Sequence, residues 1–107
     1  MAQPSSRPSS SEPGAPLARS LAEDLARTLR AVADPTRLQI LSVVLDSSDG
    51  RATVGQLSDA LELRQPTVTH HVRILVDDGL LQREPDGKFV WLSVSPDRLP
   101  AIQDLLR

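Results

Sequence analysis

The residues best placed to recognise a ligand lie in one polar stretch, residues 63–76. At about 100° per residue on a helix, Thr69, His70 and Arg73 fall on one side of this stretch, while mostly valine and leucine side chains fall on the other. The stretch contains two arginines and no acidic residue, although the whole chain carries a net charge of −2. Hydroxyl, imidazole and guanidinium groups on one helix face are typical of a helix that reads base edges in the major groove of DNA. The spacing therefore predicts nucleic-acid recognition.

Catalytic and thiolate chemistry are not expected from this composition. The chain has no cysteine, which excludes disulfides, thiolate metal sites and cysteine nucleophiles. Its two histidines, His70 and His71, point about 100° apart on a helix, so they cannot chelate one ion as an i, i+4 pair can. No nucleophile–base pair is evident, and we do not expect an enzyme. We expect His70 to contact DNA and His71 to pack beside the core with one nitrogen satisfied. The alternative is a low-affinity metal site, formed by His71 or by a cluster of carboxylates at an interface.

The length and composition indicate one small domain with a tail. The chain has 107 residues, 39% of them hydrophobic and 2% aromatic, which suffices for one modest aliphatic core. Its 12 basic and 14 acidic residues argue against a protein that binds polyanions by bulk charge. Residues 1–16 hold four of the nine prolines and five serines, so we expect them to be disordered ahead of a domain of residues 17–107. Apolar stretches fall far short of the ~18 residues that span a bilayer, and residues 1–16 lack the apolar region of a signal peptide. We therefore expect a soluble, cytoplasmic protein with no membrane partner.

Local signals in the first half of the domain predict three helices. Leucines at helical spacing predict a first helix over residues 17–33, which the Asp34-Pro35 step ends. Asp34 is then suited to cap a second helix that begins at Pro35. Thr53 and Gln56 fit a capping box at the start of a short third helix.

The second half of the domain adds the polar helix, a hairpin and a closing helix. Residues 65–78 form the fourth predicted helix, which Gly79 ends. Two β-prone runs, 80–84 and 88–94, flank a Pro-Asp-Gly turn and predict a hairpin. Ser95 is expected to cap a last helix. The order α-α-α-α-β-β-α, with two helices joined by a short turn ahead of a hairpin, predicts a mainly α winged helix-turn-helix with a small β-hairpin wing.

Two sequence motifs also resemble those of a known protein family. Residues 33–41, ADPTRLQIL, closely resemble a signature of the ArsR/SmtB bacterial transcriptional regulators, and residues 65–75, QPTVTHHVRIL, look like that family's recognition helix. Residues 78–81, DGLL, and the Gly87-Lys88 wing extend the match over roughly residues 20–107. The resemblance implies a homodimer, held by the first and last helices, that reads a double-stranded DNA operator with its paired recognition helices.

Apolar stripes on the two terminal helices fit this expectation. They exceed what so small a core needs, and an interface between two identical copies would bury the surplus. The residues expected to form the dimer interface are Leu21, Leu25 and Leu29 of the first helix and Leu99, Ile102 and Leu106 of the last.

The resemblance assigns two roles to polar residues near the fourth helix and the wing. Hydroxyl, imidazole and amide groups face base edges, and cations hold phosphates. The chain departs from the family at Arg64, where members often have a Ser cap; this leaves the helix less well capped but puts a cation near the DNA backbone. The residues carried over to base edges are Thr67, Thr69 and His70, with Gln65 nearby, and those carried over to phosphates are Arg73, Arg83 and Lys88, together with Arg64.

Many members of this family sense metals, but their usual ligand motifs are absent here. Residues 52–57, near the third helix, contain no Cys, His or carboxylate, and no histidine follows Ser95. Asp97 and Asp104 are expected to form a solvated face. The cofactor is therefore unknown, with a divalent metal, nickel or zinc, to be considered. The chain has eleven arginines and one lysine, which hints at a GC-rich genome. In bacteria with such genomes, members of this family that respond to nickel, cobalt or zinc are common, and nickel is our first guess for the effector. Alternatively, the effector binds elsewhere, a co-regulator protein senses it, or the chain binds its operator constitutively.

Two rival classes of function remain. A winged helix that serves protein–protein contact is expected to show an apolar outward face on the fourth helix rather than Thr, His and Arg. A regulator of another winged-helix family, such as the MarR-like proteins, is disfavoured by the short chain and by the lack of a long C-terminal pair of dimerisation helices.

Overall fold

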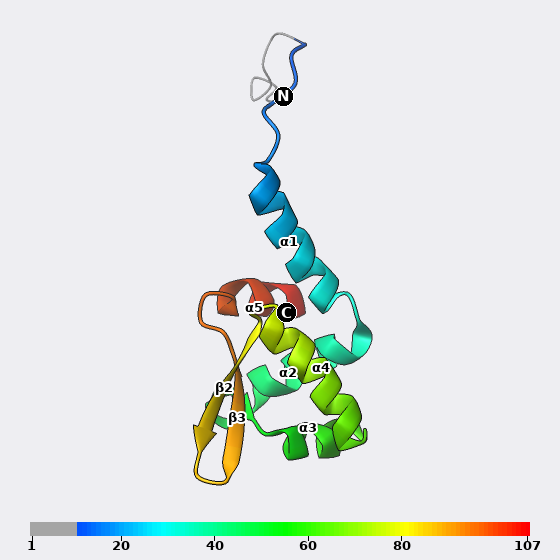
Figure 1. Cartoon of the computed structure of the whole chain (residues 1–107), viewed down its shortest axis with the longest axis vertical. Coiled ribbons are helices and arrows are strands. Elements are labelled where there is room, and N and C mark those ends of the chain that lie inside the picture. Colours follow the sequence, from blue (N-terminus) through cyan, green and yellow to red (C-terminus); the bar gives the residue numbers. More distant parts are fainter. Residues whose placement is uncertain (1–10) are drawn as a thin grey trace.

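A computed structural model describes residues 11–107 of the chain. Residues 11–18 are exposed and lie outside helices and strands, whereas residues 1–10 of the predicted tail lie outside the described part. Over residues 11–107 the fold is a winged helix-turn-helix, as the sequence predicted, with five α-helices and a small antiparallel sheet (Figure 1). The elements are α1 (Arg19–Val32), α2 (Pro35–Asp46), a short 3-10 turn (Ser48–Gly50), β1 (Arg51–Ala52), α3 (Val54–Leu61), α4 (Gln65–Asp77), β2 (Leu81–Asp86), β3 (Phe89–Val94) and α5 (Leu99–Leu106).

The predicted helix ends are confirmed where a local cap defines them. The Asp34 carboxylate accepts the backbone N–H of Arg37 at the start of α2. Thr53 and Gln56 form both hydrogen bonds of a capping box at the start of α3, at 3.0 and 3.1 Å. Gly79 follows α4 with a φ of 78°, a left-handed conformation that glycine adopts without a Cβ clash.

The sheet contains one strand that the sequence did not predict. Two residues, Arg51 and Ala52, form β1 and pair with Ser93 and Leu92 of β3, so the strand order is β1-β3-β2. So short a strand shows no alternation and is defined by its partner alone. In the hairpin, Asp86 pairs with Phe89, and the turn is therefore Gly87-Lys88 rather than Pro-Asp-Gly.

The last helix begins later than Ser95. The backbone N–H of Ser95 donates to the carbonyl of Leu80, which continues the sheet contact past β3. A turn follows, in which the Arg98 N–H donates to the Ser95 carbonyl, and α5 starts at Leu99 with Pro100 in its first turn. A proline costs little there because the first-turn N–H groups have no partner within the helix.

A single aliphatic core lies between α2, α3, α4 and the sheet. Its largest fully buried side chains include Ile40, Leu41, Leu57 and Leu75. From α1 only the last turn, Ala31 and Val32, is buried, and the rest of that helix extends away from the body (Figure 1). Over residues 11–107, no helix is long and apolar enough to cross a membrane.

Candidate nucleic-acid interface

A tight turn fixes α3 and α4 relative to each other. Glu62 ends α3 in a left-handed conformation, with φ 56°. The Ser58 hydroxyl then donates to the carbonyl of Leu63, whose own N–H donates to the carbonyl of Ser58 at 3.1 Å. Below this turn Leu57 and Val68 are fully buried, so the two helices are held by packing as well as by hydrogen bonds. The result is a helix-turn-helix with α4 in the position of the recognition helix.

The outward face of α4 gathers four of the predicted DNA-contacting residues. Gln65, Thr69, His70 and Arg73 line one open surface depression of about 480 Å³, together with Pro66. On the opposite side, α4 packs against the core through three fully or almost fully buried apolar side chains, Val68, Val72 and Leu75. The side chains that can hydrogen-bond to bases are therefore free to meet a ligand, while the backbone beneath them is anchored.

Thr67 does not share this face. It lies in the first turn of α4 and is exposed, and helix geometry puts it about 160° away from Thr69. The family resemblance assigned Thr67, Thr69 and His70 to base edges, and the structure brings only the last two together. Thr67 lies instead toward the side of α4 that carries His71.

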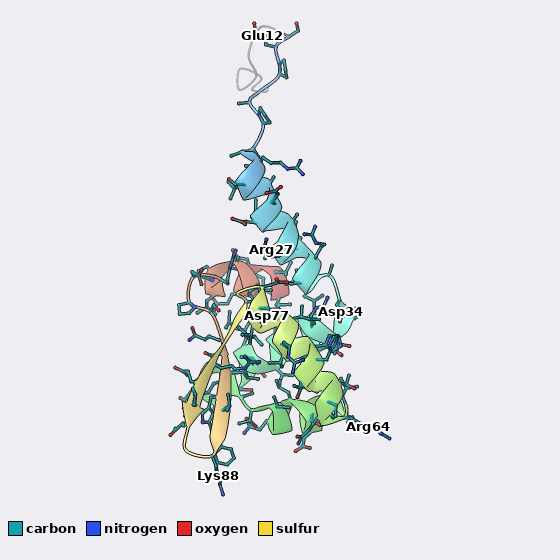
Figure 2. The ribbon with its side chains drawn as sticks, in the orientation of Figure 1. Glu12, Arg27, Asp34, Arg64, Asp77 and Lys88 are labelled. Atoms are coloured by element: carbon teal, nitrogen blue, oxygen red, sulfur yellow. The ribbon has the colours of Figure 1, made fainter. Side chains whose placement is uncertain are left out.

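Cations flank the α4 surface at two points. Arg64 precedes α4, and Lys88 occupies the turn of the hairpin; Figure 2 shows both side chains projecting outward, from the end of α4 and from the tip of the wing. Arg83 is exposed on β2. These positions suit the phosphate contacts expected of them, because a phosphate is bound most easily by a cation that solvent can reach.

The wing carries charges and a stacked pair that the sequence reading missed. Glu84 and Asp86 are exposed on β2, so the acidic groups of the hairpin offset its basic ones. The guanidinium of Arg51 lies over the Trp91 ring, 4.3 Å from the ring centre. The alternation of β2 could have indicated the two acids, but the Arg51–Trp91 contact depends on the pairing of β1 with β3.

A second polar cluster joins α1, α2 and α4. Arg37 lies next to His71, with 3.3 Å between Nη1 of the arginine and Nδ1 of the histidine. Arg37 also donates to two carbonyls at the end of α1, those of Arg30 and Ala31. The pKa of the Asp34 carboxyl is lowered, chiefly because it accepts the Arg37 backbone N–H; the Arg37 and His71 charges add to this, and burial opposes it. The prediction that His71 packs with one satisfied nitrogen agrees with this contact.

The leucines of α1 remain exposed in the single chain. Leu21, Leu25 and Leu29 are 48%, 42% and 63% exposed. Between α1 and α5 lies an apolar groove of about 290 Å³, which Leu25 and Leu29 line. From α5, Leu105 also lines this groove and is 53% exposed, and the sequence reading did not single it out.

The three residues predicted for the α5 side of a dimer are used largely inside the chain. Ile102 is 3% exposed and belongs to the core, although it also lines the groove. Leu99 and Leu106 are partly buried against the core. Their part in a dimer stays a prediction, and any such part is smaller for Ile102 than its place in the helical stripe suggested.

The side chains of the described residues do not form a metal centre. Residues 11–107 contain no group of three His, Cys, Asp or Glu side chains arranged to hold an ion. His70 and His71 are adjacent, with ring centres 5.5 Å apart in an edge-to-face arrangement. The donor set of a nickel or zinc site is therefore not provided by the described part of one chain.

The tight turn between α3 and α4, the polar outward face of α4 and the hairpin are together the features of a winged helix-turn-helix transcriptional regulator. Comparison with known proteins identifies the family. The model for "Bacterial regulatory protein, arsR family" matches residues 34–83, which include α2, the helix-turn-helix and the start of the wing. The chain belongs to the ArsR family.

Several relatives share most of the chain. The transcriptional activator HlyU of Vibrio cholerae is 36% identical over 78 residues, which cover 73% of this chain and 69% of that protein. An uncharacterised HTH-type transcriptional regulator of Methanocaldococcus jannaschii, MJ1325, is 32% identical over 84 residues, covering 78% and 92% of the two chains. The solved structure of Vibrio cholerae HlyU superposes with a TM-score of 0.73 at 32% identity, covering 82% of this chain and 92% of that one. The protein is thus a transcriptional regulator and not an enzyme.

Proposed function

We propose that the protein binds a specific DNA operator as a homodimer, with α4 in the major groove. The observation that carries this proposal is the gathering of Gln65, Thr69, His70 and Arg73 on the exposed face of α4. An amide, a hydroxyl, an imidazole and a guanidinium provide both donors and acceptors, which is the chemistry that distinguishes base pairs in the major groove.

The charge around this face supports the same use. Arg64 and Lys88 stand at the start of α4 and at the wing tip, where the backbone on either side of a groove would lie. Each phosphate that such a cation neutralises releases counterions and makes binding depend on salt. Because the chain as a whole is slightly acidic, its non-specific affinity, for DNA that lacks the operator sequence, is expected to be low.

The exposed leucines of α1 support a dimer. The apolar face of α1 extends from the body beside an apolar groove. The same face of a second copy of the chain can cover it and remove it from water. Two recognition helices in such a dimer would lie about one duplex turn apart, ~34–36 Å, and the operator would be an imperfect inverted repeat.

A protein–protein role for the fourth helix has less support, because the outward face of α4 is polar rather than apolar.

A response to nickel or zinc is not part of the proposal, because the described residues of one chain do not provide its ligands. A thermal-shift screen of the protein against divalent metals tests this point: a midpoint raised by one metal alone would show that the folded protein binds that metal. A co-regulator protein remains a prediction.

The experiment that tests operator binding begins by selecting duplexes from a random library of about 30 base pairs, long enough for two half-sites one turn apart. Thr69→Ala and His70→Ala should then each cost ~1–3 kcal/mol on the selected duplex and much less on a scrambled one. Arg73→Ala and Lys88→Ala should weaken both duplexes similarly and lower the salt dependence by about one counterion. Equal losses by all four variants on both duplexes would show that α4 does not read bases.

A further inference from the structure

Arg37 joins three helices from separate parts of the sequence. Its Nε donates to the Ala31 carbonyl at 2.6 Å and its Nη2 to the Arg30 carbonyl at 3.4 Å, both at the end of α1. Its Nη1 reaches His71, in the middle of α4. Over residues 11–107, this is the one side-chain hydrogen bond that links α2 to α4. The helix with the exposed leucines is thereby tied to the helix with the base-facing side chains.

The Arg37–His71 hydrogen bond requires one tautomer of His71. A guanidinium has five N–H donors and no acceptor, so in this contact Nδ1 of His71 must be the acceptor. The imidazole is then neutral, with its proton on Nε2. An imidazolium carries a proton on both nitrogens, so protonation would remove the acceptor and place two cations 3.3 Å apart.

We propose that the Arg37–His71 hydrogen bond is a proton-sensitive link that holds α4 in its DNA-binding orientation relative to α1. Protonation of His71 breaks the link and weakens binding to the operator. The inference rests on the proposed function, since operator binding is the property that the link controls. Histidine is the side chain whose charge ordinarily changes between about pH 5 and 8, and the pH dependence of binding is therefore measured across that range.

The groups around His71 explain why this link affects the DNA-facing surface. Arg37 faces His71 from α2, and Asp34 at the start of α2 is close enough for its charge to interact with that of His71. The Asp34 carboxylate favours the imidazolium, but it already accepts the Arg37 backbone N–H. From α4 itself, the ring of His70 meets that of His71 edge to face. Because His70 lies on the base-facing surface, a displaced His71 ring also removes the support of His70.

The tautomer is tested first, without DNA. Nitrogen-detected correlation spectra of the ¹⁵N-labelled full chain, at about pH 7.5, distinguish a bare ring nitrogen from a protonated one. We expect bare Nδ1 and protonated Nε2 for His71. A proton on Nδ1 would overturn the link, because Arg37 could not then donate to that atom.

The DNA test compares wild type with His71→Asn on the duplex selected by wild type. The side-chain oxygen of Asn can take the place of Nδ1 as acceptor, but Asn does not titrate. Between about pH 7.5 and 5.5, wild type should lose about tenfold or more in affinity relative to His71→Asn, the lower end of what one hydrogen bond to a charged group contributes. His70→Asn separates the two imidazoles: because His70 lies on the base-facing surface, this variant should bind more weakly at both pH values, and only its change in affinity between them is compared with that of wild type. A pH-dependent loss that disappears in His70→Asn would belong to His70 and would overturn the link.

Arg37→Met provides a second variant that keeps the length of the side chain but has no N–H donor. With its fold checked by circular dichroism and melting, it should bind the selected duplex more weakly than wild type at both pH values and with the pH dependence of His71→Asn. Parallel pH curves for wild type and His71→Asn would overturn the link alone, as would a folded Arg37→Met with wild-type affinity. If the selection enriches no sequence, the proposed function fails and the link falls with it.

Discussion

Leu29 allows the dimer prediction to be tested in quantitative terms. It is 63% exposed in the single chain, the most exposed of the α1 leucines. Full burial of a leucine side chain contributes about 1.5–3 kcal/mol, so sealing Leu29 against a second copy contributes about 1–2 kcal/mol in each protomer. Both copies lose this in Leu29→Ala, and the retained Cβ reduces the loss slightly. The expected destabilisation of the dimer is therefore about 2–3 kcal/mol, or about a 30- to 150-fold rise in its dissociation constant.

Sedimentation over a range of concentrations measures this constant directly. Val90→Ala is the matched control, because Val90 is 45% exposed on the wing and lies outside the predicted interface. It should leave the dimer constant unchanged. At nanomolar concentration Leu29→Ala should also lose operator affinity, and higher protein concentration should restore it. A monomeric wild type at micromolar concentration, or equal constants for Leu29→Ala and Val90→Ala, would refute the reasoning.

Three further predictions concern the stability of the fold. Asp34→Ala should lower the free energy of unfolding by about 1 kcal/mol, and Asp34→Asn by less, because Asn still caps α2; denaturant unfolding measures both. The lowered pKa of Asp34 stabilises the fold above its ordinary value of 3.8, and this is lost as pH falls through the lowered value, so the advantage of wild type over Asp34→Asn should disappear in acid. Leu57→Ala should cost about 2–5 kcal/mol, since Leu57 is fully buried, and an unchanged melting midpoint would contradict this. Removal of residues 1–16 should leave the melting temperature and the dimer constant unchanged, because the segment has no large apolar residue after Met1; a clear fall in either would show that it packs.

Features with local causes were predictable from the sequence. The Asp34 cap, the Thr53–Gln56 box and the left-handed Gly79 each depend on residues no more than a few positions apart, and each is found where predicted. The face of α4 was also predictable, because helical periodicity alone separates its core side from its outward side. Its one exception is Thr67, which was assigned by resemblance rather than by angle.

The features that were missed depend on contacts distant in the sequence. β1 has only two residues, and its partners in β3 lie about forty positions later. The contact between Arg37 and His71 spans 34 positions, so no local pattern reveals it. Likewise, the stripe on α5 was correctly recognised as apolar, but periodicity cannot tell whether a residue such as Ile102 faces its own core or a second chain.

The distribution of charge along α4 is compatible with DNA binding by a slightly acidic chain. Figure 2 shows Arg64 at one end of the helix and Asp77 at the other, beside α5. The helix dipole is positive at the end near Arg64 and negative at the end near Asp77, so the fixed charges have the same sign as the dipole at both ends. Both end charges are therefore unfavourable for the helix itself, and in the proposed operator complex Arg64 would lie beside phosphates. Arg73 then stands between them on the base-facing side. In the proposed complex the cations that meet DNA lie on α4 and on the wing, and the net negative charge of the rest of the chain disfavours other approaches of DNA.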